Sequence, residues 1–362
     1  MERKYWFWIN NLKGIGNNKI RKLLCDFGDD PYNIFRCGNL AGMGLNYLSN
    51  QDIDTLTDAD LRKKTFLLYE KYLEKGIKFV FPFEEQYPKR LNELFDKPYI
   101  LYYKGRLPIK DRPSIAVVGS RNCSEYGRSM AREIARALAL HDVNVISGLA
   151  LGVDSEAHRG SIMAGGRTFG VLAGTVEECY PAQNFNLYMD MLKDGGVLSE
   201  FGPGTRTVPG MFPMRNRIIS GLCDGVIVVE AGKRSGSLIT VSRALEQNRD
   251  IYAVPGRVGD PDSMGCNRLI AEGASIIISI DELMESLGLD NGNAAAEGKN
   301  NLCLASEENL LYSLLLDFGP KSLETLIHDS KLPVSEVLQG IVGLEIAGLV
   351  REVSKNIYVR VI

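Results

Sequence analysis

One pattern limits the fold of this chain more than any other: between residues 112 and 288, short apolar runs alternate with amphipathic helical segments. The first run, 115–118, is followed by helical periodicity over 126–140 and then by a second run, 143–146. Strands that alternate with helices in this way form βαβ units, and the strands of such units lie parallel. We therefore predict an α/β fold whose core is a Rossmann-like, mostly parallel sheet.

Glycine recurs where the expected strands end. Further strands are expected over 168–172, 225–229, 251–254 and 275–278. The glycines that follow the carboxyl ends of expected strands are Gly119, Gly148, Gly174, Gly232 and Gly256. Ligands of open parallel sheets bind at this edge, and glycine allows a ligand close to the backbone. The pattern predicts a binding site along the edge, although some of these glycines are expected to form ordinary strand-to-helix turns.

The segments on either side differ in character, and they suggest a division into domains. We predict a helical domain of the helix-hairpin-helix or SAM-like kind over 1–75, a connecting segment over 76–111 and the Rossmann-like domain over 112–288. Small and polar residues over 289–302 are typical of a linker. Residues 303–362 read as helix, turn, helix and two short strands, which predicts a winged-helix-like domain.

Both terminal segments leave their roles open. Residues 12–20 have the glycine spacing of a helix-hairpin-helix turn, which either packs as a hairpin or presents backbone N–H groups to a phosphate. In the tail, the expected recognition helix 334–346 carries Glu336 and Glu345 but no lysine or arginine. A negative helix repels phosphate, so this helix favours contact with a protein over contact with DNA.

Composition excludes several classes of protein. The formal net charge is -3, so any nucleic-acid site has to be a local basic patch. The seven cysteines are scattered and never form a C-x-x-C pair, which predicts reduced thiols in a cytoplasmic protein. No apolar run is long enough for a membrane span. We expect no metal, no cofactor and no membrane association.

The first candidate motif lies at the end of the first strand. Gly119, Ser120 and Arg121 follow the strand, and the G-x-G-x-x-G fingerprint of dinucleotide-binding proteins is missing. A helix that begins here would attract an anion, and the guanidinium of Arg121 suits a phosphate. The alternative interpretation is a helix cap with a surface arginine.

The second candidate motif is Arg215-Asn216-Arg217, close to an expected helix start. Side chains two positions apart do not share a helix face. We expect one arginine to face the ligand and the other to hold the loop. The alternative interpretation is a solvated pair.

The third candidate motif follows the strand 225–229. It contains Lys233, Ser235, Gly236 and Ser237, and glycine, serine and basic residues between a strand and a helix typically cradle phosphate. It is not a Walker A motif, because the G-x-x-x-x-G-K-[ST] order is missing.

Two further groups of polar residues have competing interpretations. Asn267 either hydrogen-bonds a base edge or caps its helix, and capping is the better interpretation. Asp154 and His158 lie one helical turn apart and are either an acid–base pair or a hydrogen-bonded pair that fixes the helix to the loop 147–149. We favour the structural pair.

In this order and at these spacings, the motifs resemble the DNA-processing protein A family (DprA, also called Smf). The resemblance rests on residues 118–121, 147–154, 212–222, 235–240, 254–256 and 265–270. It implies a protein that binds single-stranded DNA, protects incoming DNA, forms a homodimer and promotes loading of the RecA recombinase in natural transformation and recombination. It also implies that the protein is not an enzyme. The candidate DNA contacts are Gly119, Ser120, Arg121, Arg215, Asn216, Arg217, Lys233, Ser235, Gly236, Ser237 and Asn267.

The alternative function is a Rossmann-like nucleotide hydrolase that resembles the phosphoribohydrolases. Those enzymes carry a P-G-G-x-G-T loop with a catalytic glutamate, and residues 230–237 lack that loop. Only Glu200 and Glu230, at expected strand ends, are available as catalytic carboxylates.

Overall fold

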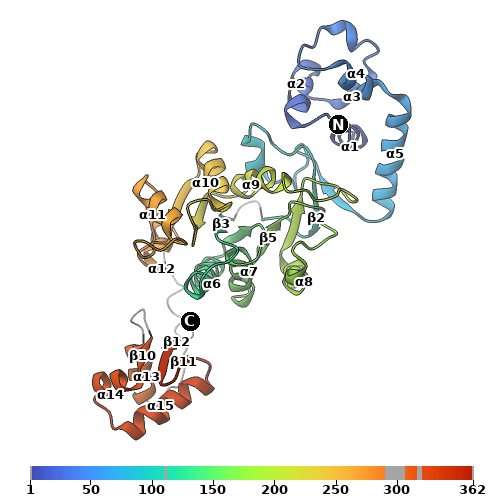
Figure 1. Cartoon of the computed structure of the whole chain (residues 1–362). Helices are drawn as coiled ribbons and strands as arrows, with labels where there is room; N and C mark the ends of the chain where they lie inside the picture. The colour runs from blue at the N-terminus through green and yellow to red at the C-terminus, as the bar shows by residue number, and fades with distance from the viewer. Residues whose placement is uncertain (1, 110–111, 290–305, 316–319, 361–362) are drawn as a thin grey trace. The chain divides into compact units, whose positions relative to one another are not determined.

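Figure 1 shows the computed structural model of the chain, which describes residues 2–109, 112–289, 306–315 and 320–360. The chain divides into two compact units, Met1–Asp290 and Asn291–Ile362. Most of the predicted linker 289–302 lies outside the described residues. The predicted boundaries inside the first unit stay predictions.

A nine-stranded sheet forms the centre of the first unit, in the order β1-β2-β6-β5-β4-β3-β7-β8-β9. The seven strands from β3 to β9 are parallel to one another. Their bounds are β3 Ser114–Val118, β4 Asn144–Ser147, β5 Thr168–Val171, β6 Gly196–Ser199, β7 Gly225–Val228, β8 Asp250–Ala253 and β9 Ser275–Ile276. The prediction of a Rossmann-like, mostly parallel sheet is confirmed.

The segment 76–111, which the sequence predicts as a connecting segment, contains two strands of the sheet. It contributes β1 Lys78–Val80 and β2 Leu101–Gly105 to the sheet. Both strands run antiparallel to their neighbours, and β2 pairs with β6. Tyr102 is buried against the helices of residues 1–75, so these strands join the sheet to those helices.

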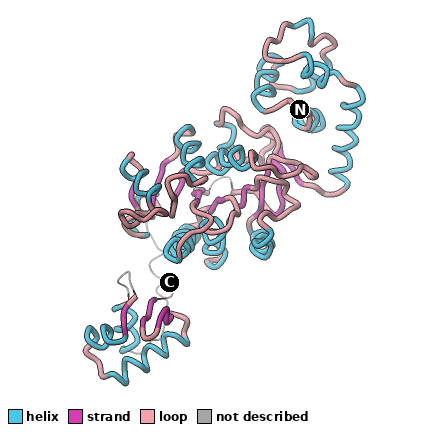
Figure 2. Tube along the Cα trace, viewed as in Figure 1, coloured by secondary structure: helices cyan, strands magenta, loops and turns pink. Residues whose placement is uncertain are grey.

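Helices cover both faces of the sheet. Successive residues of each strand point to opposite faces, so neighbouring residues of a strand pack against different helices. From β3, Ile115 and Val117 pack towards α6 Glu125–Leu140, α7 Val153–Met163 and α12 Ile280–Ser286. Ala116 and Val118 pack towards the other face, which is covered by α9 Met211–Gly221, α10 Ser237–Glu246 and α11 Met264–Ala271. Figure 2 shows the strands between these two helical layers. Strands buried on both faces explain why the sequence runs are continuously apolar.

Five helices precede the sheet: α1 Arg3–Asn10, α2 Asn17–Phe27, α3 Pro31–Arg36, α4 Asn50–Thr57 and α5 Ala59–Glu74. Their core is aromatic, and Phe7 and Trp8 are fully buried in it. The same hydrophobic cluster includes Phe79 of β1 and Met191 of α8 Phe185–Asp194. The helices therefore share a core with one end of the sheet. Short 3₁₀ helices occur at Ala41–Met43, Lys89–Glu93 and Ala182–Asn184.

The second unit is small and has its own core. Its elements are α13 Ser306–Leu314, β10 Lys321–Ser322, α14 Leu323–Ser330, α15 Val334–Ile346, β11 Val350–Ser354 and β12 Ile357–Arg360. The three strands pair antiparallel in the order β10-β12-β11. This order of helices and strands is the one that a winged-helix domain requires, and the assignment itself stays a prediction. Within the described residues of the chain, no helix is both long and apolar enough to cross a membrane.

Candidate nucleic-acid interface

The strand order reverses at β3, and this reversal defines the candidate site. The chain adds β4, β5 and β6 on one side of β3 and then crosses to add β7, β8 and β9 on the other. Ligands of open α/β sheets bind at the carboxyl ends of the strands at such a switch point. The predicted motifs at 119–121 and 233–237 follow β3 and β7, so they meet on the two sides of this point.

Hydrogen bonds tie the two loops together. The backbone N–H of Ser120 donates to the carbonyl oxygen of Glu230, at 2.7 Å. The carboxylate of Glu230 accepts from the backbone N–H and the hydroxyl of Ser124, at 2.9 and 2.6 Å. Ser124 caps α6, so Glu230 holds the start of that helix beside the end of β7. Its negative charge is favourable there because it faces the positive end of the helix dipole.

Two glycines are required for the close contact between loops. A Cβ on Gly119 would lie 2.6 Å from Cγ2 of Val153 and 2.9 Å from the carbonyl oxygen of Glu230. Gly152, which precedes α7, has φ +76°, and a Cβ there would lie 2.6 Å from the carbonyl oxygen of Arg121. Gly119 and Gly152 therefore allow the loops to pack on each other. The sequence predicted Gly119 as part of an anion-binding cradle. In the structure, its Cα instead faces Val153 and Glu230.

Arg121 is exposed, and aromatic side chains lie beside it. Its guanidinium lies 5.4 Å from the ring centroid of Phe212, which stands in the first turn of α9. The ring of Tyr180, which is 57% exposed, lies 5.7 Å from the ring of Phe212. A cation next to accessible aromatic faces is the combination that binds phosphates and stacks bases of single strands.

The loop after β7 adds a second basic element. Lys233 and Arg234 are both exposed, and neither has an ion-pair partner within the part of the chain that the structure describes. The hydroxyl of Ser235 lies 2.7 Å from the hydroxyl of Ser237, the first residue of α10. Gly236 is exposed just before the helix. The predicted cradle therefore lies at a helix N-terminus, where anions are stabilised.

Arg215 lies in the interior of the protein. Its guanidinium donates to the carbonyl oxygens of Gly148, at 2.9 Å, and Val171, and so joins the ends of β4 and β5 to α9. Burial lowers the pKa of Arg215 to about 10, although the nearby carboxylate of Asp154 acts in the opposite direction. The guanidinium therefore stabilises the loops at the edge from inside the protein. It has no exposed face that could contact DNA in this conformation.

Asp154 and His158 are both buried, but they do not form the expected hydrogen-bonded pair. The Asp154 carboxylate accepts from the backbone N–H groups of Gly148 and Ala150, at 3.0 and 3.3 Å. The Nδ1 atom of His158 lies 2.6 Å from the hydroxyl of Thr168. Burial lowers the pKa of His158 to about 3, so the ring is neutral. Asp154 fixes the loop after β4 as predicted, and His158 fixes β5 instead.

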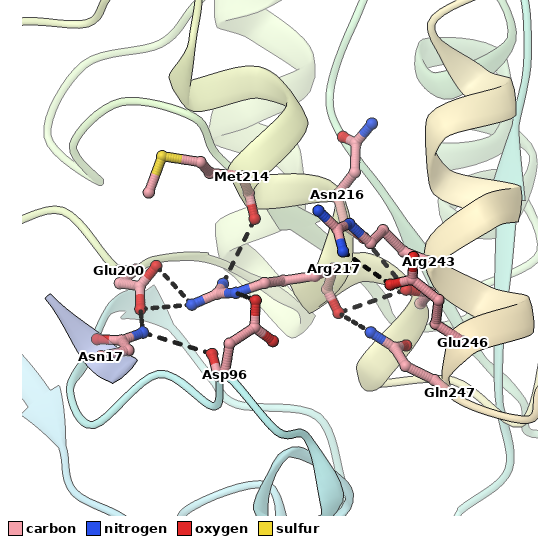
Figure 3. A network of polar contacts seen from close by, with 10 residues as sticks. Asn17, Asp96, Glu200, Met214, Asn216, Arg217, Arg243, Glu246 and Gln247 are labelled. Carbon is pink, nitrogen blue, oxygen red and sulfur yellow. Dashed lines mark hydrogen bonds and ion pairs between the residues drawn. The ribbon is translucent and has the colours of Figure 1, made fainter. Parts of the chain in front are cut away.

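Arg217 is also buried and is the centre of a polar network (Figure 3). Its guanidinium contacts the carboxylate of Glu200 at 2.8 Å and that of Asp96 at 3.1 Å. Burial alone lowers the pKa of Arg217, but the two carboxylates more than offset this effect and the net shift is upward. Asn17, the first residue of α2, donates to Glu200 at 2.6 Å. The network therefore attaches the hairpin 12–20 to the ligand edge, which favours the packing interpretation of that hairpin.

The two candidate asparagines are also engaged with the protein. Asn216 accepts from Nε of Arg215 at 3.1 Å, and its amide lies 3.5 Å from the carbonyl oxygen of Gly236. Asn267 accepts from the N–H of Gly256 and donates to its carbonyl oxygen, each at 3.0 Å. Asn267 lies inside α11, so the prediction that it caps this helix is wrong. Its side chain instead fixes the turn after β8.

The candidate residues thus fall into two sets. Those at the surface of the edge come from the loops after β3 and β7: Ser120, Arg121, Lys233, Ser235 and Gly236. Those buried or tied to the protein behind it are Gly119, Arg215, Asn216, Arg217, Ser237 and Asn267. Tyr180 was missed, although an aromatic residue before a proline in the loop after an expected strand was a usable signal. Among the described residues, no group of three or more His, Cys, Asp or Glu could hold a metal ion.

Together these features define a class: a Rossmann-like protein whose ligand edge offers cations, aromatic rings and a helix N-terminus in place of a dinucleotide fingerprint. The model of the family described as DNA recombination-mediator protein A matches residues 78–288. The chain belongs to this family, which confirms the resemblance to DprA and Smf proteins.

Relatives match along most of the chain. Protein Smf of Synechocystis is 31% identical and the match covers 97% of both chains. The DNA processing protein DprA of Streptococcus pneumoniae is 38% identical over 75% of this chain and 93% of its own. Its X-ray structure superimposes with a TM-score of 0.63, at 34% identity over 78% of this chain and 97% of that one.

A second solved structure concerns DNA processing protein A from Helicobacter pylori and its single-stranded DNA binding mode. It is 28% identical and covers 58% of this chain and 95% of its own, with a TM-score of 0.53. Both structures match the Rossmann-like fold found here.

Proposed function

We propose that this chain binds single-stranded DNA along the carboxyl edge of the sheet, at the switch point between β3 and β7. The observation that carries the proposal is the exposed guanidinium of Arg121 over Phe212, with Tyr180 beside that ring. The exposed Lys233 and Arg234 lie on the neighbouring loop. The cations contact successive phosphates and the rings stack bases, so binding is salt-sensitive and tolerant of sequence.

A related protein supports this proposal. The Helicobacter pylori relative is described as having a single-stranded DNA binding mode, and it shares the Rossmann-like fold. We further propose that the chain acts as a homodimer in the cytoplasm, protects incoming DNA and promotes loading of RecA during natural transformation. These finer roles rest on membership of the family.

We propose that the edge binds and does not catalyse. Glu230 and Glu200, the carboxylates that a nucleotide hydrolase would use, both have structural partners. Glu230 caps α6 through Ser124, and Glu200 is paired with Arg217. Release of free base from nucleoside monophosphates, abolished by Glu230→Gln, would contradict this proposal.

The test is fluorescence anisotropy of a labelled oligo-dT titrated with the protein at two salt concentrations, with a duplex of equal length for comparison. We expect preference for the single strand and a loss of affinity of about tenfold or more for Arg121→Glu. Arg121→Gln should lower the slope of log affinity against log salt by about 0.7, the value for one lost phosphate contact.

The matched control is Arg243→Gln. Arg243 is an arginine whose side chain is 42% exposed, and it is paired with Glu246 in the last turn of α10, away from the loop that precedes this helix. We expect this variant to bind like the parent protein. Equal binding of single strand and duplex, or equal binding by the parent and Arg121→Glu, would overturn the proposal.

A further inference from the structure

Helix α15 in the second unit is apolar on two faces. One face, with Val337, Ile341 and Leu344, is buried in the core of the unit. The other face carries four aliphatic side chains that are exposed by 42 to 83%: Val334, Leu338, Val342 and Ile346. We call these four residues the α15 stripe. Within the described part of its own unit, nothing buries the stripe.

The spacing of the stripe favours a helix as its occupant. Its members are four residues apart, so they form one continuous i±4n ridge along α15. A ridge of this kind fits the groove between two corresponding ridges of another helix, with a crossing angle of about −50°. Exposed apolar side chains scattered singly need no explanation, but a ridge along a whole helix is a contact surface.

The charges around the stripe indicate which side chains the partner helix carries. Glu345, three residues after Val342, lies on the same face of α15, and its carboxylate accepts from the N–H of Glu352 at 3.1 Å. Helix α15 contains no lysine or arginine. A complementary partner therefore carries cationic side chains next to its apolar face.

The same features disfavour three other occupants. Nucleic acid needs cations or accessible aromatic rings, and the stripe has neither. An anionic membrane surface is repelled by Glu345 and Glu352. A second copy of α15 brings the same glutamates to the contact with no cation of its own to pair with them.

We propose that the α15 stripe docks an amphipathic helix of a partner protein, with aliphatic residues on one face and lysine or arginine beside them. This surface belongs to the second unit, whereas the edge proposed to bind DNA belongs to the first. Binding there leaves the affinity for oligo-dT unchanged.

The test uses the full chain and a labelled synthetic helix of about 18 residues, with leucine at helical spacing and lysine elsewhere. Anisotropy is recorded for the parent protein and for the double variant Leu338→Gln, Val342→Gln. Glutamine is a good helix former, and both sites are exposed, so the unit should stay folded. The matched control is Leu67→Gln, which changes another exposed leucine, in α5.

We expect the double variant to bind the peptide about tenfold more weakly or worse, and the control to bind like the parent. A peptide with the same leucines but glutamate in place of lysine should also bind about tenfold more weakly to the parent protein. This second comparison needs no variant, so it holds even if the double variant is unstable. Oligo-dT affinity should be the same in all three proteins.

Three results would overturn the proposal. The first is equal binding of the lysine peptide by the parent and the double variant, which would place the peptide elsewhere. The second is that replacement of lysine by glutamate in the peptide leaves its binding unchanged, whether both peptides bind or neither does. The third is self-association of the parent in sedimentation that the double variant abolishes, which would make a second copy the occupant.

Discussion

Arg121 and Arg217 show how differently two arginines contribute to the same edge. Arg217 has a side chain that is 6% exposed and holds Glu200 and Asp96, whereas Arg121 is exposed, lies over an aromatic ring and has no ion-pair partner among the described residues. A buried ion pair is costly to break, because removal of one partner leaves a buried charge without compensation. An exposed cation adds little to stability and is free to meet a ligand.

Loss of Arg217 should therefore act on stability. For Arg217→Met we expect the free energy of unfolding of the first unit to fall by about 3 kcal/mol, because the buried ion pair with Glu200 is broken and the carboxylate loses its guanidinium partner. Urea unfolding followed by tryptophan emission measures this, since Trp6 and Trp8, the two tryptophans of the chain, both lie in the first unit. The control, Arg121→Gln, should change stability by less than about 0.5 kcal/mol. Equal stability of the parent and Arg217→Met would contradict the role of the network.

His158 should make the first unit sensitive to acid. In the unfolded chain this histidine takes up a proton below about pH 6.5, but burial keeps its folded pKa at about 3. Its contribution to stability is fully present above pH 6.5 and is lost progressively as the pH falls from 6.5 towards 3. The free energy of unfolding should fall in this window by up to about 1.4 kcal/mol per pH unit from this residue alone.

The comparison variant is His158→Gln, which cannot titrate. Its unfolding free energy, measured from pH 7 to 4.5 by urea titration, should depend less steeply on pH than that of the parent. The buried Asp154 has a raised pKa, which acts in the opposite direction, but it is present in both proteins and cancels in the comparison. Parallel pH profiles would rule out a neutral buried His158.

For single residues, the sequence predicted that the motifs lie at the carboxyl edge of the sheet, but it did not predict the role of each arginine. The motif 215–217 predicted that its two arginines face different directions, and they do. It could not show that both point inwards, because their partners Gly148, Asp96 and Glu200 come from distant parts of the chain. Burial of a charged side chain is decided by such tertiary partners and leaves no local pattern.

Among the elements, α7 is positioned by the glycine that precedes it. Gly152 lies in the left-handed region, and its Cα faces the backbone of the loop after β3, so that any side chain would push this loop away. Gly165, beyond the other end of the same helix, also has a positive φ of +70°, but a Cβ there would meet nothing within 4 Å. Both glycines have a positive φ, and only Gly152 is crowded.

Gly152→Ala and Gly165→Ala therefore form a matched pair. Each should lose about 1 kcal/mol of stability from the left-handed backbone. Gly152→Ala should lose about 1 to 3 kcal/mol more from overpacking, and its affinity for oligo-dT should also fall, because Arg121 moves with the loop. Urea unfolding and anisotropy measure the two effects. Unchanged DNA affinity in Gly152→Ala would show that the loop position does not matter for binding.

The parallel strands were predictable, and the antiparallel ones were not. Runs such as 115–118 are apolar on both faces because helices cover both sides of β3, so their pattern is visible without a structure. Strand β1 has only three residues. Strand β2 ends in Lys104, which is exposed, and Gly105, which is half-buried. Strands this short and partly exposed have no periodicity that distinguishes them from loops.

For the whole molecule, the division into two units predicts separate functions. The first unit contains the complete switch-point edge, and the second contains the α15 stripe and its glutamates. Deletion of residues 291–362 should leave the affinity for oligo-dT within about threefold of the parent and the salt slope unchanged. Anisotropy and tryptophan-monitored unfolding of the shortened chain test this. A loss as large as that of Arg121→Glu would make the second unit a DNA-binding element.

The reversal of strand order at β3 has a consequence for how the protein is made. The loop after β3 leaves the ribosome more than a hundred residues before the loop after β7, since Val118 pairs with Val228. A chain interrupted between them has an open strand edge at β3 and lacks Glu230, which holds Ser120 in place. Such a fragment is prone to aggregate and is a substrate for chaperones and proteases. An unfinished chain of this kind therefore lacks one of the two loops that form the edge.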